Sequence, residues 1–182
     1  MTYNAQTSTD SHGAARSGAQ REATLRLWFE ERDYTFIKSF KDAAIHIGLP
    51  LTPGGNVRAK DREFISNWLE GRQVFQAEGD YAEAGFSYFL SDGYVPQLDA
   101  IFELKGGDKQ GTTEEKLFFD LMKMEDGCYG DRKVFYIFEG KKEQDKCTLL
   151  FERRLKALQK RGVATNVTIV RFSEMERHFP AS

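Results

Sequence analysis

Three ionisable side chains alternate with apolar ones in the short stretch of residues 98–105, which reads LDAIFELK. Successive side chains of a strand point to opposite faces, so Asp99, Glu103 and Lys105 would share one face with Ile101, and the other face would be apolar. Charged side chains are seldom buried in a sheet unless they are paired or bind a metal ion. The pattern therefore indicates either a solvated strand face with a Glu–Lys pair or a site that uses carboxylates and an amine.

The flanking segments predict an α/β fold in which helices flank a mixed sheet. Helical periodicity is expected over residues 22–32, 35–47 and 64–70, and strands over 73–78 and 85–90. Asp92-Gly93 is typical of a hairpin turn, after which residues 95–105 would form the next strand. A helix over 112–125, a strand over 133–138, a helix over 147–161, a strand over 166–172 and a short terminal helix complete the prediction.

Composition bounds the class of protein. The chain has 182 residues with a formal net charge of −2 and 40% hydrophobic residues, enough for one domain with a real core. Residues 1–20 lack apolar periodicity and are expected to form a disordered tail, which leaves one domain over residues 21–182. The two cysteines and three histidines are too far apart for a zinc site, so any bound metal should have oxygen ligands. No segment resembles a membrane span or signal peptide, which predicts a cytoplasmic protein without a membrane partner.

The string VPQLDAIFELKGG, followed by a helix, resembles the PD-(D/E)xK motif of type II restriction endonucleases and many repair nucleases. Glu103-Leu104-Lys105 resembles the E-x-K half, and Asp99, downstream of Pro96, resembles the acidic half. The core of that family is a helix, three antiparallel strands, a helix and a parallel strand (αβββαβ). The elements expected between about residues 21 and 172 follow this order, with extra helices near the N-terminus.

The resemblance implies a metal-dependent hydrolase that cuts DNA. Asp99, Glu103 and the main-chain carbonyl of Leu104 would bind Mg²⁺, which prefers hard oxygen ligands and for which Mn²⁺ would substitute. Lys105 would orient or deprotonate the attacking water and stabilise the phosphate. We therefore expect an endonuclease that cleaves double-stranded DNA to leave 5′-phosphate ends. Because both strands of a symmetric site must be cut, a homodimer is expected.

The identity of the first acidic ligand stays open at this point. Asp99 lies only four residues before Glu103, which would separate their Cα atoms by about 13 Å on a flat strand. A bulge or a kink after Pro96 would shorten that distance, and we favour Asp99 on this basis. Asp92 is the rival, because a chain reversal near Pro96 would bring it to the face of Glu103. Asp80 is a third candidate.

Several further residues could support the site. Lys109, Gln110 and Lys116 lie just past it, near the expected start of a helix, where anions are attracted. Glu31, like Glu30, ends the first helix and could add a carboxylate.

A row of basic residues in the helix over residues 147–161 could contact DNA phosphates, namely Arg153, Arg154, Lys156, Lys160 and Arg161. Two other functions fit the same residues. One is a structure-specific or nicking nuclease of repair or recombination. The other is a non-catalytic nucleic-acid-binding subunit, in which the strand only presents a polar face.

Overall fold

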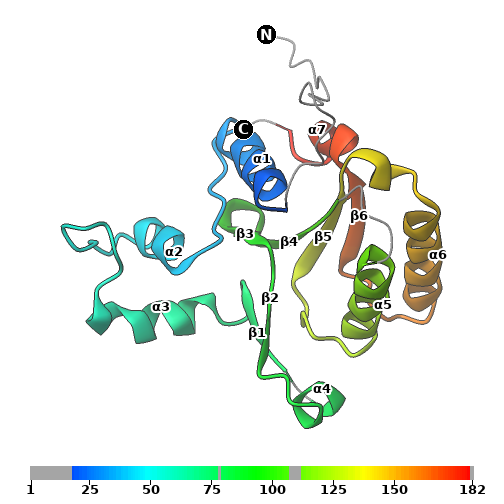
Figure 1. Cartoon of the computed structure of the whole chain (residues 1–182), viewed down its shortest axis with the longest axis horizontal. Coiled ribbons are helices and arrows are strands. Elements are labelled where there is room, and N and C mark those ends of the chain that lie inside the picture. The colour runs from blue at the N-terminus through cyan, green and yellow to red at the C-terminus, as the bar shows by residue number, and fades with distance from the viewer. Residues whose placement is uncertain (1–17, 78, 107–111, 181–182) are drawn as a thin grey trace.

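A computed structural model describes residues 18–77, 79–106 and 112–180 of the chain, without the side chains of residues 112–114. Its centre is a four-stranded mixed sheet in the order β3-β4-β5-β6 (Figure 1). The strands are β3 (Gly93–Val95), β4 (Ala100–Lys105), β5 (Lys133–Phe138) and β6 (Val167–Arg171). β3 runs antiparallel to β4, whereas β4, β5 and β6 are parallel. The predicted α/β class with a mixed sheet is confirmed.

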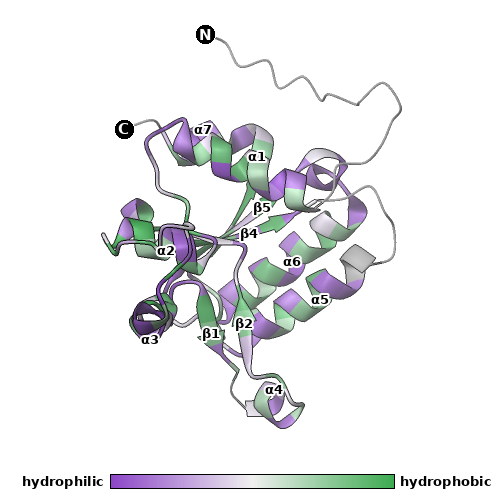
Figure 2. Ribbon diagram, turned by 60° about the vertical axis from the view of Figure 1, so that its left-hand side comes forward, coloured by the Kyte–Doolittle hydropathy of each residue, from purple (hydrophilic) through white to green (hydrophobic). Residues whose placement is uncertain are grey.

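Helices cover both faces of this sheet (Figure 2). α5 (Thr112–Glu125) and α6 (Lys146–Lys160) pack on one face. α1 (Gly18–Glu30) and the short α7 (Met175–His178) pack on the other face. The 3-10 turn Gly140–Glu143 precedes α6, and the 3-10 turn Phe172–Glu174 precedes α7. Because β5 lies between two covered faces, its sequence KVFYIF is apolar almost throughout, as expected for a doubly buried strand.

The face alternation predicted for the LDAIFELK strand holds from Ala100 onward. Ala100 and Phe102 belong to the core cluster with α1 and α7. Ile101 belongs to the cluster with α5 and α6, and Glu103 is buried on that same side. The period of two in the sequence therefore assigns the ionisable residues of β4 to the face that α5 and α6 cover.

The N-terminal part begins earlier than predicted, and its second helix is shorter than predicted. α1 starts at Gly18, so residues 18–20 of the expected tail are helical, and residues 1–17 lie outside the described residues. α2 (Phe40–His46) is capped by Ser39, whose hydroxyl accepts from the Asp42 amide. A 3-10 turn over Ala59–Asp61 leads into α3 (Arg62–Leu69), and both helices share a small core with Ile37.

The two strands expected before Asp92 form a separate ribbon. β1 (Val74–Gln76) pairs antiparallel with β2 (Tyr88–Leu90), and the short helix α4 (Gly79–Glu83) lies between them at the end of the ribbon (Figure 1). Phe75 and Phe89 turn inward and join the core under α5. The main sheet therefore contains one antiparallel pair of strands, instead of the three antiparallel strands that the resemblance implies.

The predicted hairpin turn at Asp92-Gly93 is wrong. Gly93 begins β3, and a Cβ atom there would lie 2.0 Å from the ring of Phe36, so glycine is required by close packing. The chain reverses instead through the 3-10 turn Pro96–Leu98, which ends at Asp99 in the left-handed conformation with φ 44°. This reversal sets β3 against β4 and determines which aspartate meets Glu103.

Candidate functional site

Glu103 and Lys105 meet at the carboxyl end of β4, beneath α5. Glu103 is only 4% exposed, and the Lys105 Nζ lies 3.1 Å from its Oε2. The predicted Glu–Lys pair is therefore present, but it is buried instead of solvated. A buried ion pair is retained only when its remaining hydrogen-bonding capacity is also satisfied, which directs attention to the surrounding groups.

A second ion pair continues from Lys105 into α5. Its Nζ also lies 2.9 Å from Asp120 Oδ2, and Lys123 Nζ lies 2.8 Å from Asp120 Oδ1. Lys123 is buried among the rings of Phe89, Phe119 and Tyr129, with centroid distances of 5.6, 5.9 and 5.4 Å. The sequence analysis missed Asp120 and Lys123. The sequence does contain a signal for Asp120, because it lies between Leu117 and Met124 on the helix face that packs against the sheet. An acid on an apolar helix face indicates a buried charge that needs a partner.

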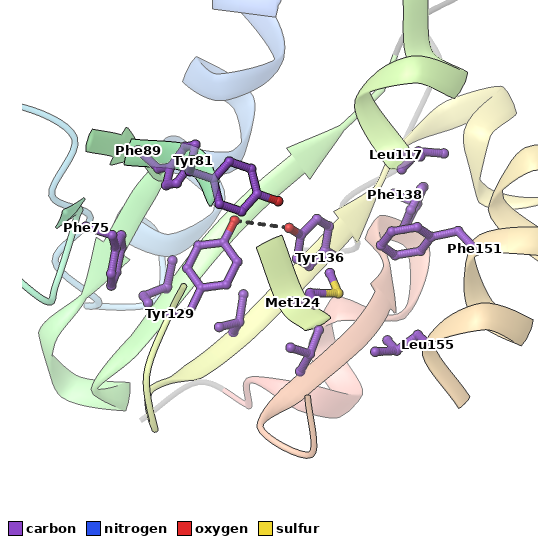
Figure 3. Packing of buried hydrophobic residues seen from close by; sticks show 13 residues of the cluster. Phe75, Tyr81, Phe89, Leu117, Met124, Tyr129, Tyr136, Phe138, Phe151 and Leu155 are labelled. Carbon is purple, nitrogen blue, oxygen red and sulfur yellow. Dashed lines mark hydrogen bonds between the residues drawn. The ribbon is translucent and has the colours of Figure 1, made fainter. Parts of the chain in front are cut away.

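Two tyrosine hydroxyls complete the surroundings of Glu103. Tyr129 OH donates to Glu103 Oε1 over 3.0 Å and lies 3.1 Å from Tyr136 OH. Figure 3 shows these two hydroxyls facing each other within the aromatic core. Burial, followed by the nearby carboxylates, raises the pKa of Tyr129 well above its ordinary value. The pKa of Tyr136 is raised in the same way, so both hydroxyls keep their protons and act as hydrogen-bond donors.

Asp92 is the aspartate that approaches Glu103. Because Gly93 pairs with Phe102, Asp92 continues the register to a position opposite Glu103. Asp92 Oδ2 accepts a hydrogen bond of 2.7 Å from the Leu104 amide. Burial, and then the charge of Glu103, raises the pKa of Asp92 to about 6. Two carboxylates held together away from water in this way favour a cation between them.

Asp99 does not share this face, so the placement predicted for it is wrong. It precedes β4 at the end of the 3-10 turn, and its side chain is 67% exposed. Asp99 Oδ1 accepts from Tyr94 OH over 2.6 Å and forms an ion pair with Arg132. The left-handed residue ends the turn and directs the carboxylate away from the strand face, where it links β3 to the start of β5.

The other predicted residues do not converge on Glu103. Lys116 is exposed on α5, and Glu31 is exposed after α1, 4.0 Å from Arg32. Asp80 lies in α4, not in a strand. Gln110 lies outside the described residues. The first helix does bring an acid nearby, but it is Glu22, whose charge contributes to the raised pKa of Asp92.

A wide cleft lies at the opposite end of the strands, where β4 and β5 begin. It has a volume of about 1110 Å³ and includes Asp80, Asp99 and Arg132 in its lining. Asp99 and Arg132 neutralise each other there. The other acids that line the cleft, Glu70, Asp80, Asp126 and Asp131, are exposed to solvent. We place the candidate site at Glu103 instead of in the cleft, because the carboxylates there are buried.

The donor set at this site suits a hard cation such as Mg²⁺. Within the described residues no three His, Cys, Asp or Glu side chains are grouped to hold a metal ion. Asp92 and Glu103 are two carboxylate donors. The Lys105 carbonyl accepts from the Glu139 amide on the β5 side. Because the main-chain groups of successive strand residues point to opposite sides, the carbonyl of Leu104 points toward β3, as its amide does. Two carboxylates and the Leu104 carbonyl would therefore bind through oxygen alone.

A count of formal charges points the same way. Asp92, Glu103 and Asp120 carry three negative charges, and Lys105 and Lys123 carry two positive charges, so the network sums to −1. Buried charge of one sign is costly unless it is compensated. The carboxylates of Glu103, Asp120 and Asp92 outweigh burial and raise the pKa of Lys105 above its ordinary value. Lys105 is therefore positively charged beside these three carboxylates.

No family model, curated protein or solved structure matches this chain. Among the described residues, no helix is both long and apolar enough to cross a membrane.

Proposed function

We propose that the protein is a Mg²⁺-dependent endonuclease that hydrolyses phosphodiester bonds in double-stranded DNA through a PD-(D/E)xK-like site. The observation that carries the proposal is the meeting of Asp92 with Glu103 at one end of the sheet, beside Lys105. Asp92 takes the place that the sequence analysis favoured for Asp99. An α/β sheet that places such residues at strand ends supports the nuclease-like core, although its first two strands form a separate ribbon.

Each residue has a role that follows from its surroundings. Asp92, Glu103 and the Leu104 carbonyl would hold the metal, which when bound polarises the phosphate and lowers the pKa of a bound water. Lys105 keeps its positive charge and would stabilise the charge that develops on the phosphate when water attacks in line. The other role considered from the sequence, deprotonation of the attacking water by Lys105, stays a prediction. Cleavage would leave 5′-phosphate ends, and two copies would serve the two strands.

The test is cleavage of plasmid and phage DNA with Mg²⁺ or Mn²⁺, beside EDTA controls. Glu103→Gln keeps the size of the side chain and its acceptor for Tyr129, so loss of cleavage reports the lost charge. We expect Glu103→Gln and Lys105→Met each to lower the rate by on the order of 10²-fold or more. Asp99→Asn is the matched control and should cleave like the parent protein. Cleavage that persists in Glu103→Gln would refute the assignment.

A second candidate function is supported by the ion pairs of Lys105. Its contacts with both Glu103 and Asp120 would also suit a structural cluster in a non-catalytic nucleic-acid-binding subunit. That function predicts DNA binding without cleavage on any substrate. Branched and mismatched duplexes belong in the same panel, because cleavage of these alone would identify a structure-specific or nicking enzyme.

A further inference from the structure

The outer face of α6 is basic, with two exposed leucines, Leu149 and Leu150, among its cations. Five cationic side chains on this helix are exposed, namely Lys146, Arg153, Arg154, Lys156 and Lys160. The helix contains one acid, Glu152, which is half-buried and forms an ion pair with Arg171 at 2.7 Å. The exposed face of α6 therefore presents positive charge with no acid among its own residues.

Three of these residues form a straight line along the helix. Lys146, Arg153 and Lys160 follow one another at intervals of seven residues. Seven residues turn an α-helix to within about 20° of the starting direction and advance it by about 10.5 Å. The line is therefore about 21 Å long, and Arg154 and Lys156 flank it on either side. We call these five residues the α6 basic face.

The side chains of the α6 basic face form no ion pairs in the part of the chain that the structure describes. Arginines elsewhere in the described residues commonly form ion pairs. Examples are Arg26 with Glu30, Arg132 with Asp99 and Arg171 with Glu152. Arg161, just beyond the helix, is also paired, with Glu125 at 3.2 Å. In a chain of net charge −2, positive charge is thus left uncompensated along one helix.

We infer that the α6 basic face binds the phosphate backbone of double-stranded DNA. Neutralisation of phosphates by Lys and Arg supplies most of the sequence-independent affinity of DNA-binding proteins. Duplex DNA as the partner rests on the proposed function, whereas binding by α6 does not require hydrolysis. Leu149 and Leu150 are exposed on α6, but the larger apolar face of the helix, with Phe151, Leu155 and Leu158, is buried. A membrane surface is therefore a poorer fit, because α6 has no broad apolar face left to enter lipid. Figure 2 shows this division as alternating hydrophilic and hydrophobic segments along α6.

The experiment measures duplex binding by the full chain in EDTA, where cleavage is absent, across a series of salt concentrations. The variant Lys146→Gln/Arg153→Gln/Lys160→Gln removes the line of charge and retains good helix formers. Each lost phosphate contact should reduce the slope of log K against log salt by about 0.9, and should weaken binding at 0.1 M salt by roughly eightfold. We expect a slope smaller by about 2.7, while Lys146→Arg/Arg153→Lys/Lys160→Arg retains the parent slope.

A matched control removes three exposed charges elsewhere, as Lys41→Gln/Lys60→Gln/Arg177→Gln. If this control lowers the slope as much as the α6 variant does, binding follows net charge alone and the inference is overturned. Binding to phosphatidylserine vesicles in place of duplex DNA would also overturn it. Hydrolysis is judged separately with Mg²⁺: normal binding by α6 without cleavage would reject the proposed function alone, whereas cleavage with an unchanged slope would reject the inference about α6 alone.

Discussion

The Asp92→Asn substitution separates a functional carboxylate from a structural one. Its Oδ1 can still accept the hydrogen bond from the Leu104 amide, so the local geometry is retained. Only the negative charge is lost. We expect this variant to be inactive as a nuclease and yet more stable than the parent protein when no divalent cation is present.

The size of the effect follows from the pKa of Asp92. Folding raises it from 3.8 to about 6, so the folded state binds the proton more tightly than the unfolded state. The free energy of unfolding of the parent protein therefore decreases as pH rises from about 4 to about 6 and loses about 3 kcal/mol from this group, at ~1.4 kcal/mol per pKa unit. Above pH 6 the loss is complete. Asparagine has no charge to lose or gain, so Asp92→Asn does not have this loss. The variant should therefore be only slightly more stable than the parent protein at pH 4 and about 3 kcal/mol more stable at pH 8.

Urea unfolding in EDTA at pH 4, 6 and 8 measures this difference directly. A repeat at pH 8 with Mg²⁺ at one hundred times its dissociation constant should stabilise the parent protein by about 2.7 kcal/mol and leave Asp92→Asn unchanged. The reasoning is refuted if the variant is no more stable than the parent at pH 8, or if its advantage does not grow with pH. An Mg²⁺ effect of equal size in both proteins would show that Asp92 is not a ligand.

Two further substitutions test the surroundings of the site. Asp120→Asn leaves the buried Lys123 without its carboxylate partner, and we expect a loss of about 3 kcal/mol or more, seen as a fall in Tm of ~6–12 °C for a chain of this size. Adding Lys123→Met should restore part of that loss, and additive effects of the two substitutions would contradict a direct ion pair. Asp99→Asn should cost about 1 kcal/mol or less, because the carboxylate is exposed and asparagine tolerates the left-handed conformation. A large loss of cleavage in Asp99→Asn, with normal stability, would return Asp99 to the active site.

Periodicity predicts most of the layers of this fold. The apolar run of β5 and the helical spacing of α6 place both elements almost to the residue, because each is decided by burial of a local pattern. The ribbon of β1 and β2 is not predictable in the same way. Its strands alternate like any half-buried pair, and only packing of Phe75 and Phe89 under α5 separates it from the main sheet.

The residues of the site likewise fall into two groups, those predicted from a local pattern and one placed by tertiary packing. Glu103 and Lys105 are found from the sequence because an acid and an amine two residues apart on an otherwise apolar strand must share a face. The position of Asp92 beside Glu103 cannot be predicted from the sequence, because Asp-Gly is a strong hairpin signal. Nothing nearby in the sequence shows that Phe36 fills the space above Gly93. The glycine that suggests a turn is instead there to admit an aromatic ring from a segment far upstream. The reversal at Pro96–Leu98 pairs Gly93 with Phe102 and so brings Asp92 to Glu103. Sequence spacing alone favours Asp99, which instead pairs with Arg132.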